Sequence, residues 1–290
     1  MTPSSFLEKQ VAGFVEELAK ETDVVRQSEM FKAYLDAVSK FWHYSFHNQV
    51  LIYLQKKDAS RVAGFVAWNK LGRSVLKGSN AIKILAPFTK KILQKDENGE
   101  EKERSFTYFV PVNVFDVSQT KGKELPKLDI EVKGDNQKEL LEKLLEFCKQ
   151  KNIEVEFRQL GVNGLYGYSK GGKISIDCNQ SVNTQANTLI HEIAHELLHY
   201  SLEGKKFSKQ EKETQAEAIT YVITRHFGLE NKSALYLAAY NANYKNLAES
   251  LKQVSETTGK ILNFLEQNQL LEEEASKEKK QLLAVAVSRR

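Results

Sequence analysis

The stretch Val182-Asn-Thr-Gln-Ala-Asn-Thr-Leu-Ile-His-Glu-Ile-Ala-His-Glu-Leu-Leu-His-Tyr200 decides how the second half of this 290-residue chain folds. Its apolar residues recur at helical spacing, which predicts one helix over 182–200. His191 and His195 are four residues apart, so they lie on one face of that helix, one turn from each other. Two imidazoles placed in this way can bind one zinc ion, and Glu192 can take a proton from water on that ion. The stretch therefore predicts a zinc site with hydrolytic chemistry.

A carboxylate ligand for this site is available on the next predicted helix. That helix begins at a capping box, Ser208-Lys-Gln-Glu211, and ends near Gly228. Glu213 and Glu217 lie one turn apart on one of its faces. Because catalytic zinc takes three protein ligands, we expect Glu213 to complete the set and Glu217 to accept an N–H from a ligand histidine. The spacing also allows the two glutamates to exchange these roles.

The other histidines of this half have less specific surroundings. His199 continues the face of the motif helix by one more turn, which is typical of a packed residue or of one that supports a ligand. His226, near the end of the next helix, is a candidate for stabilising an oxyanion. A purely structural interpretation is also open, in which an acidic, solvated helix face lies beside two incidental histidines.

Three stretches of this half resemble the ImmA/IrrE metallopeptidases, which are gluzincin-like enzymes. They are Gly167-Tyr-Ser-Lys-Gly-Gly-Lys-Ile-Ser-Ile176, Leu189-Ile-His-Glu-Ile-Ala-His195 and Glu213-Thr-Gln-Ala-Glu-Ala218. The resemblance covers roughly residues 138 to 230 and implies a zincin-like fold. It also implies that the strand from Lys173 to Cys178 runs along the edge of the cleft, where it can pair with an extended peptide.

A basic stretch interleaved with aromatic residues marks the first half of the chain. Between positions 56 and 95, ten cations accompany a single acid, Asp58, although the whole chain has a net charge of only +4. Proteins bind single-stranded nucleic acid with cations that follow the phosphates and with rings that stack on the bases. The structural alternative is a solvated face with core aromatics, but such a face normally mixes both signs of charge. The ten cations are Lys56, Lys57, Arg61, Lys70, Arg73, Lys77, Lys83, Lys90, Lys91 and Lys95.

Three stretches of this region resemble the N-terminal domain of ArdC antirestriction proteins, namely Tyr44–Ile52, Arg61–Gly78 and Pro111–Thr120. The resemblance covers roughly residues 5 to 125 and implies that the domain binds single-stranded DNA. ArdC-like proteins join this domain to the metallopeptidase module and belong to conjugative or other mobile elements. The motif helix continues as Glu196-Leu-Leu-His199-Tyr200, which resembles ImmA/IrrE enzymes more than the best-known antirestriction proteins. This resemblance implies that LtrC-like proteins of conjugative plasmids are the nearer relatives. The DNA contacts that we expect are Trp42, Tyr44, Asn48, Gln49, Arg61, Trp68, Lys70, Arg73, Lys77 and Lys83.

The periodicities predict an α+β chain. Helices are expected over 3–20, 25–40 and 45–56, followed by strands over 81–86 and 106–116 that form a hairpin with an exposed loop at 94–103. A helix over 138–151 and a strand over 153–158 precede the motif helix, and helices over 233–243 and 247–267 follow. We therefore expect a helical and β-hairpin DNA-binding domain (1–125), a linker (126–137), a gluzincin-type metallopeptidase domain with C-terminal helices (138–267) and a charged tail (268–290).

Composition indicates a soluble globular protein, with 41% hydrophobic and 28% charged residues. The sequence contains no signal-like N-terminal segment and no apolar stretch long enough to span a bilayer, so we expect a cytoplasmic protein without a membrane partner. Cys148 and Cys178 are too few for a disulfide framework, and we expect both to be buried thiols.

Two functions of different classes follow from these features. The first is a zinc-dependent metalloendopeptidase that binds single-stranded DNA and acts in antirestriction or DNA transfer, with Zn²⁺ as cofactor and a protein such as a repressor as a candidate substrate. The second is a non-proteolytic, single-stranded-DNA-binding antirestriction protein whose zinc site is structural or regulatory. Replacing Glu192 with glutamine separates them, because only the first function needs this carboxylate.

Overall fold

The chain combines helices and strands in two compact units. The computed structural model describes residues 2–21, 24–95, 101–125, 137–162, 164–201, 204–229 and 247–267. The first unit is built from residues 1–129 and 241–248, and the second from residues 130–240 and 249–290. Each unit has its own core and is described by itself.

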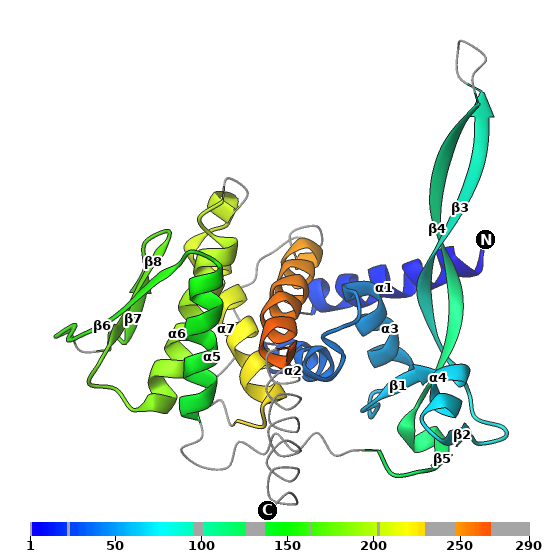
Figure 1. Cartoon of the computed structure of the whole chain (residues 1–290), viewed down its shortest axis with the longest axis horizontal. Helices are drawn as coiled ribbons and strands as arrows, with labels where there is room; N and C mark the ends of the chain where they lie inside the picture. Colours follow the sequence, from blue (N-terminus) through cyan, green and yellow to red (C-terminus); the bar gives the residue numbers. More distant parts are fainter. Residues whose placement is uncertain are drawn as a thin grey trace, which may run out of the picture. The chain divides into compact units, whose positions relative to one another are not determined.

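Three helices open the first unit: α1 (Pro3–Lys20), α2 (Val24–Phe41) and α3 (Phe46–Gln55) (Figure 1). The Thr2 hydroxyl caps α1 by accepting from the Ser5 N–H, and Pro3 occupies the first turn, where no N–H is needed. The rings of Phe14 and Tyr34 meet in the core, with their centroids 5.9 Å apart. The predicted helices are confirmed to within one residue at each end.

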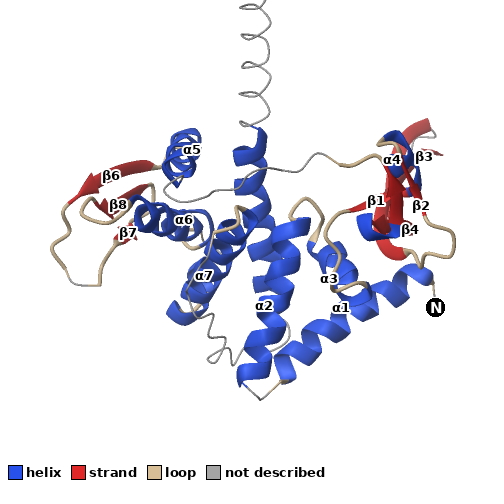
Figure 2. Cartoon of the chain, turned by 90° about the horizontal axis from the view of Figure 1, so that it is seen from below, coloured by secondary structure: helices blue, strands red, loops and turns tan. Residues whose placement is uncertain are grey.

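A long antiparallel ribbon dominates the strands of this unit (Figure 1), whose strands are drawn in red in Figure 2. β3 (Ile82–Lys95) pairs with β4 (Glu101–Asp116), and β1 (Val62–Gly64) adds to the other edge of β4. The register runs from Ile82 opposite Val114 to Lys95 opposite Glu101. The predicted hairpin is confirmed, but its strands extend into the segment that was expected to be a loop. A second, two-stranded sheet joins β2 (Arg73–Val75) to β5 (Thr120–Gly122), with the short helices α4 (Phe65–Lys70) and η1 (Val117–Gln119) beside these strands.

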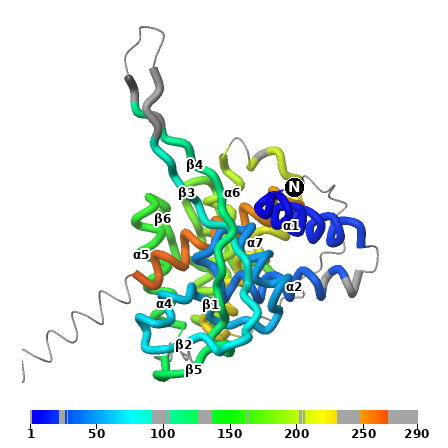
Figure 3. Tube along the Cα trace, turned by 90° about the vertical axis from the view of Figure 1, so that its right-hand side faces the viewer, coloured from blue at the N-terminus to red at the C-terminus, as the bar shows by residue number. Residues whose placement is uncertain are grey.

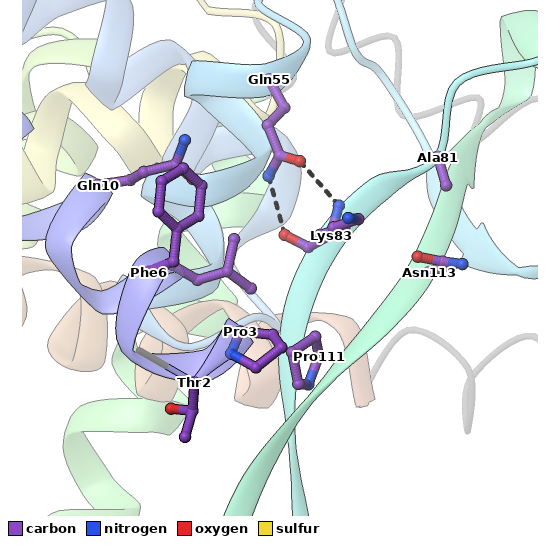
Figure 4. A pocket seen from close by; sticks show the side chains of 10 residues that line it. Thr2, Pro3, Phe6, Gln10, Gln55, Ala81, Lys83, Pro111 and Asn113 are labelled. Carbon is purple, nitrogen blue, oxygen red and sulfur yellow. Dashed lines mark hydrogen bonds between the residues drawn. The ribbon is translucent and has the colours of Figure 1, made fainter.

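Two amide side chains of α3 cover the outer edge of β3. Asn48 donates to the Leu85 carbonyl and accepts from the Leu85 N–H, both at 2.9 Å. Gln55, two turns further along α3, makes the same pair of bonds to the backbone of Lys83, at 2.8 and 2.9 Å (Figure 4). These amides take the place of a neighbouring strand, so the base of the ribbon is fixed and its edge is satisfied. Pro87 occupies the next outward position of the edge and has no N–H to offer there.

Asp116 ties the end of β4 to the chain before β1. Its buried carboxylate accepts from the N–H groups of Ser60, Arg61 and Ser118 at 2.8–3.0 Å. Burial alone would raise the pKa of Asp116, but these donors outweigh it and hold the pKa below its usual range. Asp116 is therefore an ionised, structural residue.

The second unit packs helices on a small mixed sheet. α5 (Gln137–Gln150) leads to β6 (Glu154–Arg158), β7 (Gly167–Ser169) and β8 (Lys173–Asp177), which are ordered β6-β8-β7. α6 (Val182–Leu198), η2 (Gly204–Lys206), α7 (Lys209–His226) and a helix over 247–267 follow. The side chains of Ile174 and Ile176 on β8 are fully buried. α5 and α6 both contact the sheet, and α6 packs against α5 and α7.

Two predictions for this unit were wrong. The stretch Lys173–Cys178 was expected at the cleft edge, yet β8 is the central strand, paired in parallel with β6 and antiparallel with β7. The edge strands are β6 and β7, and the cleft is lined by the start of β7. Cys178 was expected to be buried, but it is exposed because it lies just beyond β8, whereas Cys148 on α5 is buried as expected. The predicted helix over 233–243, residues 126–136 of the linker and the tail over 268–290 lie outside the described residues.

Candidate metal centre

Local sequence signals position the two helices that form the site. The Ser181 side chain accepts from the Thr184 N–H and so begins α6, while Ser208 and Glu211 form a reciprocal capping box at the start of α7. α6 buries Leu189, Ile190, Ile193 and Ala194, which leaves His191 and His195 on the face that α7 meets. Both imidazoles are mostly buried, with 18% and 14% of their side-chain surface exposed.

Three ligand atoms converge where α6 and α7 meet. The Nε2 atoms of His191 and His195 are 3.0 Å apart, and Oε2 of Glu213 lies 3.3 Å from the first and 3.7 Å from the second. Ligand atoms around a tetrahedral zinc ion, with bonds of about 2.0–2.1 Å, are separated by about 3.3 Å. The three side chains therefore fit one such ion. No other cluster of this kind occurs in the part of the chain that the structure describes.

Electrostatics favour a negatively charged carboxylate beside these rings. Hydrogen bonding to His191 and His195 holds the pKa of Glu213 well below its usual range. Burial alone would lower the pKa of His191, but the carboxylates of Glu213, Glu192 and Glu217 outweigh it and raise that pKa. Oε1 of Glu217 lies 3.5 Å from Nδ1 of His191, the ring atom that faces away from Glu213. Of the two glutamates, Glu213 thus joins both histidines and Glu217 faces only the far nitrogen of one.

A chain of buried side chains continues from His195. Nδ1 of His195 lies 2.8 Å from Nδ1 of His199. A cation bound at Nε2 of His195 would require the ring proton to be on this Nδ1 atom. His199 then keeps its proton on Nε2 and donates to Oε1 of Gln215 at 2.9 Å. The Gln215 amide donates to Ser250 at 2.9 Å and to Gln253 at 3.1 Å. The donors of His195, His199 and Gln215 thus each meet an acceptor in one arrangement of protons.

Burial lowers the pKa of His199 to about 4. At neutral pH His199 is therefore uncharged and can accept from His195 with one nitrogen while donating to Gln215 with the other. The sequence showed that His199 lies on the helix face of the ligands, but Gln215 was not predicted, because its position next to His199 depends on how α7 packs.

Glu192 lies beside the ligands in a cleft of about 440 Å³. It is 8% exposed, and burial raises its pKa even though His191 and His195 act in the opposite direction. The cleft is lined on one side by α6 and α7 and on the other by the segment that leads into β7, including Tyr166 and Gly167. Tyr166 is 48% exposed and is a cleft residue that the sequence did not single out.

The wall of the cleft is fastened to α6. The Glu196 carboxylate accepts from the N–H groups of Gly171 and Gly172 at 2.9 and 2.6 Å, and the Tyr200 hydroxyl donates to the Ser169 carbonyl. A Cβ atom at Gly167 would lie 2.6 Å from the Thr188 methyl group, so only glycine allows this close approach of β7 to α6.

His226 is not among the residues that line this cleft. Its Nε2 is 2.8 Å from the Glu266 carboxylate on the helix over 247–267. The predicted role in stabilising an oxyanion does not fit this position.

Both halves of the chain match known domain families. Residues 8–115 match the model of the N-terminal domain of anti-restriction factor ArdC, and residues 148–258 match the IrrE N-terminal-like domain of the peptidase M78 family. The chain joins an ArdC N-terminal domain to an IrrE-type domain. The two resemblances that the sequence motifs indicated are thereby confirmed.

Relatives of the whole two-domain chain are distant. An uncharacterized protein of Bacillus anthracis is 25% identical over 274 residues, which cover 79% of this chain and 46% of that protein. The chain thus spans about half the length of that relative. The antirestriction protein ArdC of plasmid R388 has a metal-free crystal structure, which is 20% identical with a TM-score of 0.47 and covers 78% of this chain and 85% of its own. The Mn(II)-bound structure of the same protein is 18% identical with a TM-score of 0.45, and the match covers 78% of this chain and 84% of that one.

The ArdC-type domain places the predicted DNA contacts in three kinds of environment. Lys70, Lys77 and Lys83 are exposed. Trp42, Tyr44, Arg61 and Arg73 are half-buried; the Tyr44 hydroxyl donates to the Val62 carbonyl, and Arg73 donates to Thr120 and to the Lys123 carbonyl. Asn48, Gln49 and Trp68 are buried.

The three buried residues have structural partners. Asn48 covers β3, Gln49 donates to the carbonyls of Phe41 and Tyr44, and the Trp68 indole donates to the Phe115 carbonyl at 2.9 Å. In this structure the three side chains are buried and hydrogen-bonded within the domain, so their positions do not favour the predicted DNA contacts. Sequence could not show this, because the aromatic and amide residues of a core and of a DNA-binding surface are of the same types.

No helix among the described residues combines the length and apolarity that crossing a membrane requires.

Proposed function

We propose that this chain is a zinc-dependent peptidase of the zincin-like, gluzincin type, whose ArdC-type domain binds single-stranded DNA. The observation that carries the peptidase part is the convergence of His191, His195 and Glu213 next to Glu192 in one cleft. Three ligands from two helices leave one coordination position for water, which is the arrangement of catalytic rather than structural zinc sites. The match to the IrrE-type family supports the same proposal.

The residues of the site divide the work of hydrolysis. Zinc held by His191, His195 and Glu213 would supply a Lewis acid and lower the pKa of a bound water molecule. Glu192 acts as the general base that takes the proton and delivers it to the leaving amine. Glu217 and the relay of His199 and Gln215 orient the two ligand rings through their Nδ1 atoms.

The substrate class follows from the wall opposite the metal centre. β7 pairs only with β8 among the described strands, so its other edge offers backbone N–H and C=O groups. An extended peptide can add to such an edge as a further strand. β7 therefore takes the role first expected of Lys173–Cys178, and the proposed substrate is an extended segment of a protein.

The DNA part of the proposal rests on the family match of the first domain and on its charge. The stretch from 56 to 95 contains ten cations and only one acid, Asp58. Eight of the cations are lysines, namely Lys56, Lys57, Lys70, Lys77, Lys83, Lys90, Lys91 and Lys95. Asp58 is itself paired with Lys56 at 2.9 Å. A phosphate-binding surface of this kind predicts an affinity that falls steeply as salt rises from about 50 to about 200 mM. Together these features support a role in antirestriction or DNA transfer.

The peptidase proposal is tested with the zinc-loaded full chain and a library of quenched fluorescent peptides. We expect Glu192→Gln to lower kcat/KM by about 10²- to 10⁴-fold while zinc binding persists, because the general base is lost and the ligands stay. Glu142→Gln, an exposed exchange of the same kind on α5, is the matched control. Cleavage that survives Glu192→Gln would refute the assigned role. Absence of cleavage in the wild type, together with protection of DNA from nucleases that Glu192→Gln leaves unchanged, would favour the non-proteolytic function with a structural or regulatory zinc.

A further inference from the structure

The ribbon of β3 and β4 in the ArdC-type domain extends beyond α1 and α3 (Figures 1 and 3). Four of its aromatic side chains are exposed. Phe88, Phe106, Tyr108 and Phe109 are 53%, 50%, 46% and 53% exposed. A cluster of large apolar side chains left in water by a folded domain commonly marks a binding surface. None of these four residues was among the predicted DNA contacts.

The register sorts these residues onto two faces. Phe88 is opposite Tyr108, and Lys90 is opposite Phe106, so these four side chains share one face of the ribbon. We name Phe88, Lys90, Phe106 and Tyr108 the ribbon face. Phe109 lies on the other face, where Lys91 is already paired with Glu103 at 2.6 Å. Lys90 has no acidic partner among the described side chains, so the ribbon face joins three rings to one uncompensated cation.

The same face changes character along the ribbon. At its base Ile82, Ile84 and Val114 are 2–6% exposed and belong to the core. Further out, the aliphatic residues give way to Phe88, Phe106 and Tyr108, which have no core to join. The rings of Phe88 and Tyr108 touch across the strands, with centroids 5.3 Å apart, and this pairing supports the ribbon. Cross-strand support does not account for Phe106, whose partner across the ribbon is Lys90.

The base of the ribbon is held rigidly, so the ribbon face keeps a defined direction. The Ser4 hydroxyl donates to the Phe109 carbonyl at 2.8 Å, and the amides of Asn48 and Gln55 hold the outer edge of β3. A preformed platform loses less conformational entropy when it binds a flexible ligand than a mobile loop does.

We propose that the ribbon face is a stacking platform for single-stranded nucleic acid, with the bases on Phe88, Phe106 and Tyr108 and a phosphate at Lys90. This inference rests on the proposed DNA binding of the domain and names the surface responsible. Residues on one face of a strand repeat every 6.5–7 Å or so, which suits successive bases of an extended strand. The face contains no acid among the described residues, as a polyanion requires.

The chemistry of the ribbon face favours a single strand over a duplex. Ribbons that enter the major groove read base edges with polar side chains, whereas rings need bases whose planes are not already stacked. An apolar protein partner would have to desolvate the Lys90 ammonium without compensation, whereas a phosphate pairs with it. The ribbon face offers rings and a cation together, which matches a strand of unpaired nucleotides.

The test uses the full chain, a fluorescein-labelled oligothymidine and fluorescence anisotropy. We expect each of Phe88→Ala, Phe106→Ala and Tyr108→Ala to raise Kd by about 5- to 140-fold, because one stacked base is lost. Lys90→Gln should reduce the slope of log Kd against log salt by about 0.7, which corresponds to one phosphate contact on a single strand. Phe109→Ala, on the opposite face with the same exposure, should leave Kd unchanged. Thermal unfolding of every variant is measured in parallel, so that a binding change in an intact domain is recognised.

Other outcomes separate this inference from the proposed function. If the wild type binds the oligonucleotide and the ribbon-face variants bind equally well, the ribbon face is refuted while DNA binding stands. If the wild type does not bind, the DNA part of the proposed function fails. Three results would overturn the assignment of a single-strand platform. The first is tighter binding of a duplex that depends on the same rings, and the second is an equal loss of affinity in Phe109→Ala. The third is a changed sedimentation coefficient in the ribbon-face variants, which would mean that the rings contact another copy of the chain.

Discussion

Replacing His199 with phenylalanine tests whether the buried relay prepares His195 to bind a metal. Phenylalanine keeps a ring of similar size but removes both nitrogens, so Nδ1 of His195 loses its acceptor at 2.8 Å and Oε1 of Gln215 loses its donor at 2.9 Å. Loss of a partner that orients a ligand histidine typically weakens metal affinity by about 10- to 100-fold. That range corresponds to about 1.4–2.8 kcal/mol of binding free energy. His199 is 5% exposed, so water does not readily replace the lost contacts.

The assay is zinc competition with a chromophoric chelator at neutral pH, carried out on the folded full chain. His226→Phe is the matched control, because it makes the same exchange in the same domain at a histidine that pairs with Glu266 instead of the relay. We expect the zinc Kd of His199→Phe to rise by one to two orders of magnitude, because the ring of His195 loses the partner that orients it, and that of His226→Phe to stay at the wild-type value. An unchanged Kd in His199→Phe, or an equal rise in both variants, would refute the reasoning.

Three further predictions concern the cores and the thiols. Trp68→Ala should lower the free energy of unfolding by about 3–5 kcal/mol, because a ring that is 2% exposed and hydrogen-bonded is removed; denaturant titration measures it, and a loss near zero would contradict the structural role. Asp116→Asn should lower the free energy of unfolding of the ArdC-type domain at neutral pH, because the ionised carboxylate is lost. In the wild type the contribution of this carboxylate should disappear only as the pH falls below about 3.9 and through the lowered pKa of Asp116. Stability curves against pH that coincide for both proteins would contradict this prediction. Iodoacetamide should label Cys178 in the native protein and spare Cys148, because Cys148 is buried and burial raises its pKa to about 12. Mass spectrometry of the intact and digested chain identifies the labelled thiol, and faster labelling of Cys148 than of Cys178 would contradict this placement.

Sequence reasoning succeeded where the signals are local. The motif helix, the capping box at Ser208 and the spacing of Glu213 depend only on neighbours in the chain, so the convergence of ligands could be anticipated from two helices. The hairpin was also predicted from its β-branched and aromatic residues, but only with strands over 81–86 and 106–116, so the outer part of the ribbon was missed. These elements needed no knowledge of how the chain packs.

Features that depend on packing could not be predicted. The three-residue strands β1, β2, β5 and β7 are too short to have a periodicity of their own, and the order of strands placed β8 in the centre of its sheet. Trp68 was expected on a DNA surface, but α4 turns it into the core. Gln215 enters the relay only because α7 packs against α6 at that point. The ribbon face was missed for a similar reason, because only the register shows which rings share a side.

The central claim is that His191, His195 and Glu213 hold one metal ion beside Glu192. The most direct test is elemental analysis of the purified full chain by mass spectrometry after loading with zinc and removal of the excess, for the wild type, His195→Ala, Glu213→Ala and Glu192→Gln. We predict one zinc ion per chain in the wild type and in Glu192→Gln, as a site with three protein ligands requires, and none in the two ligand variants. Zinc that stays bound in both ligand variants, or a wild type that holds none, would contradict this claim.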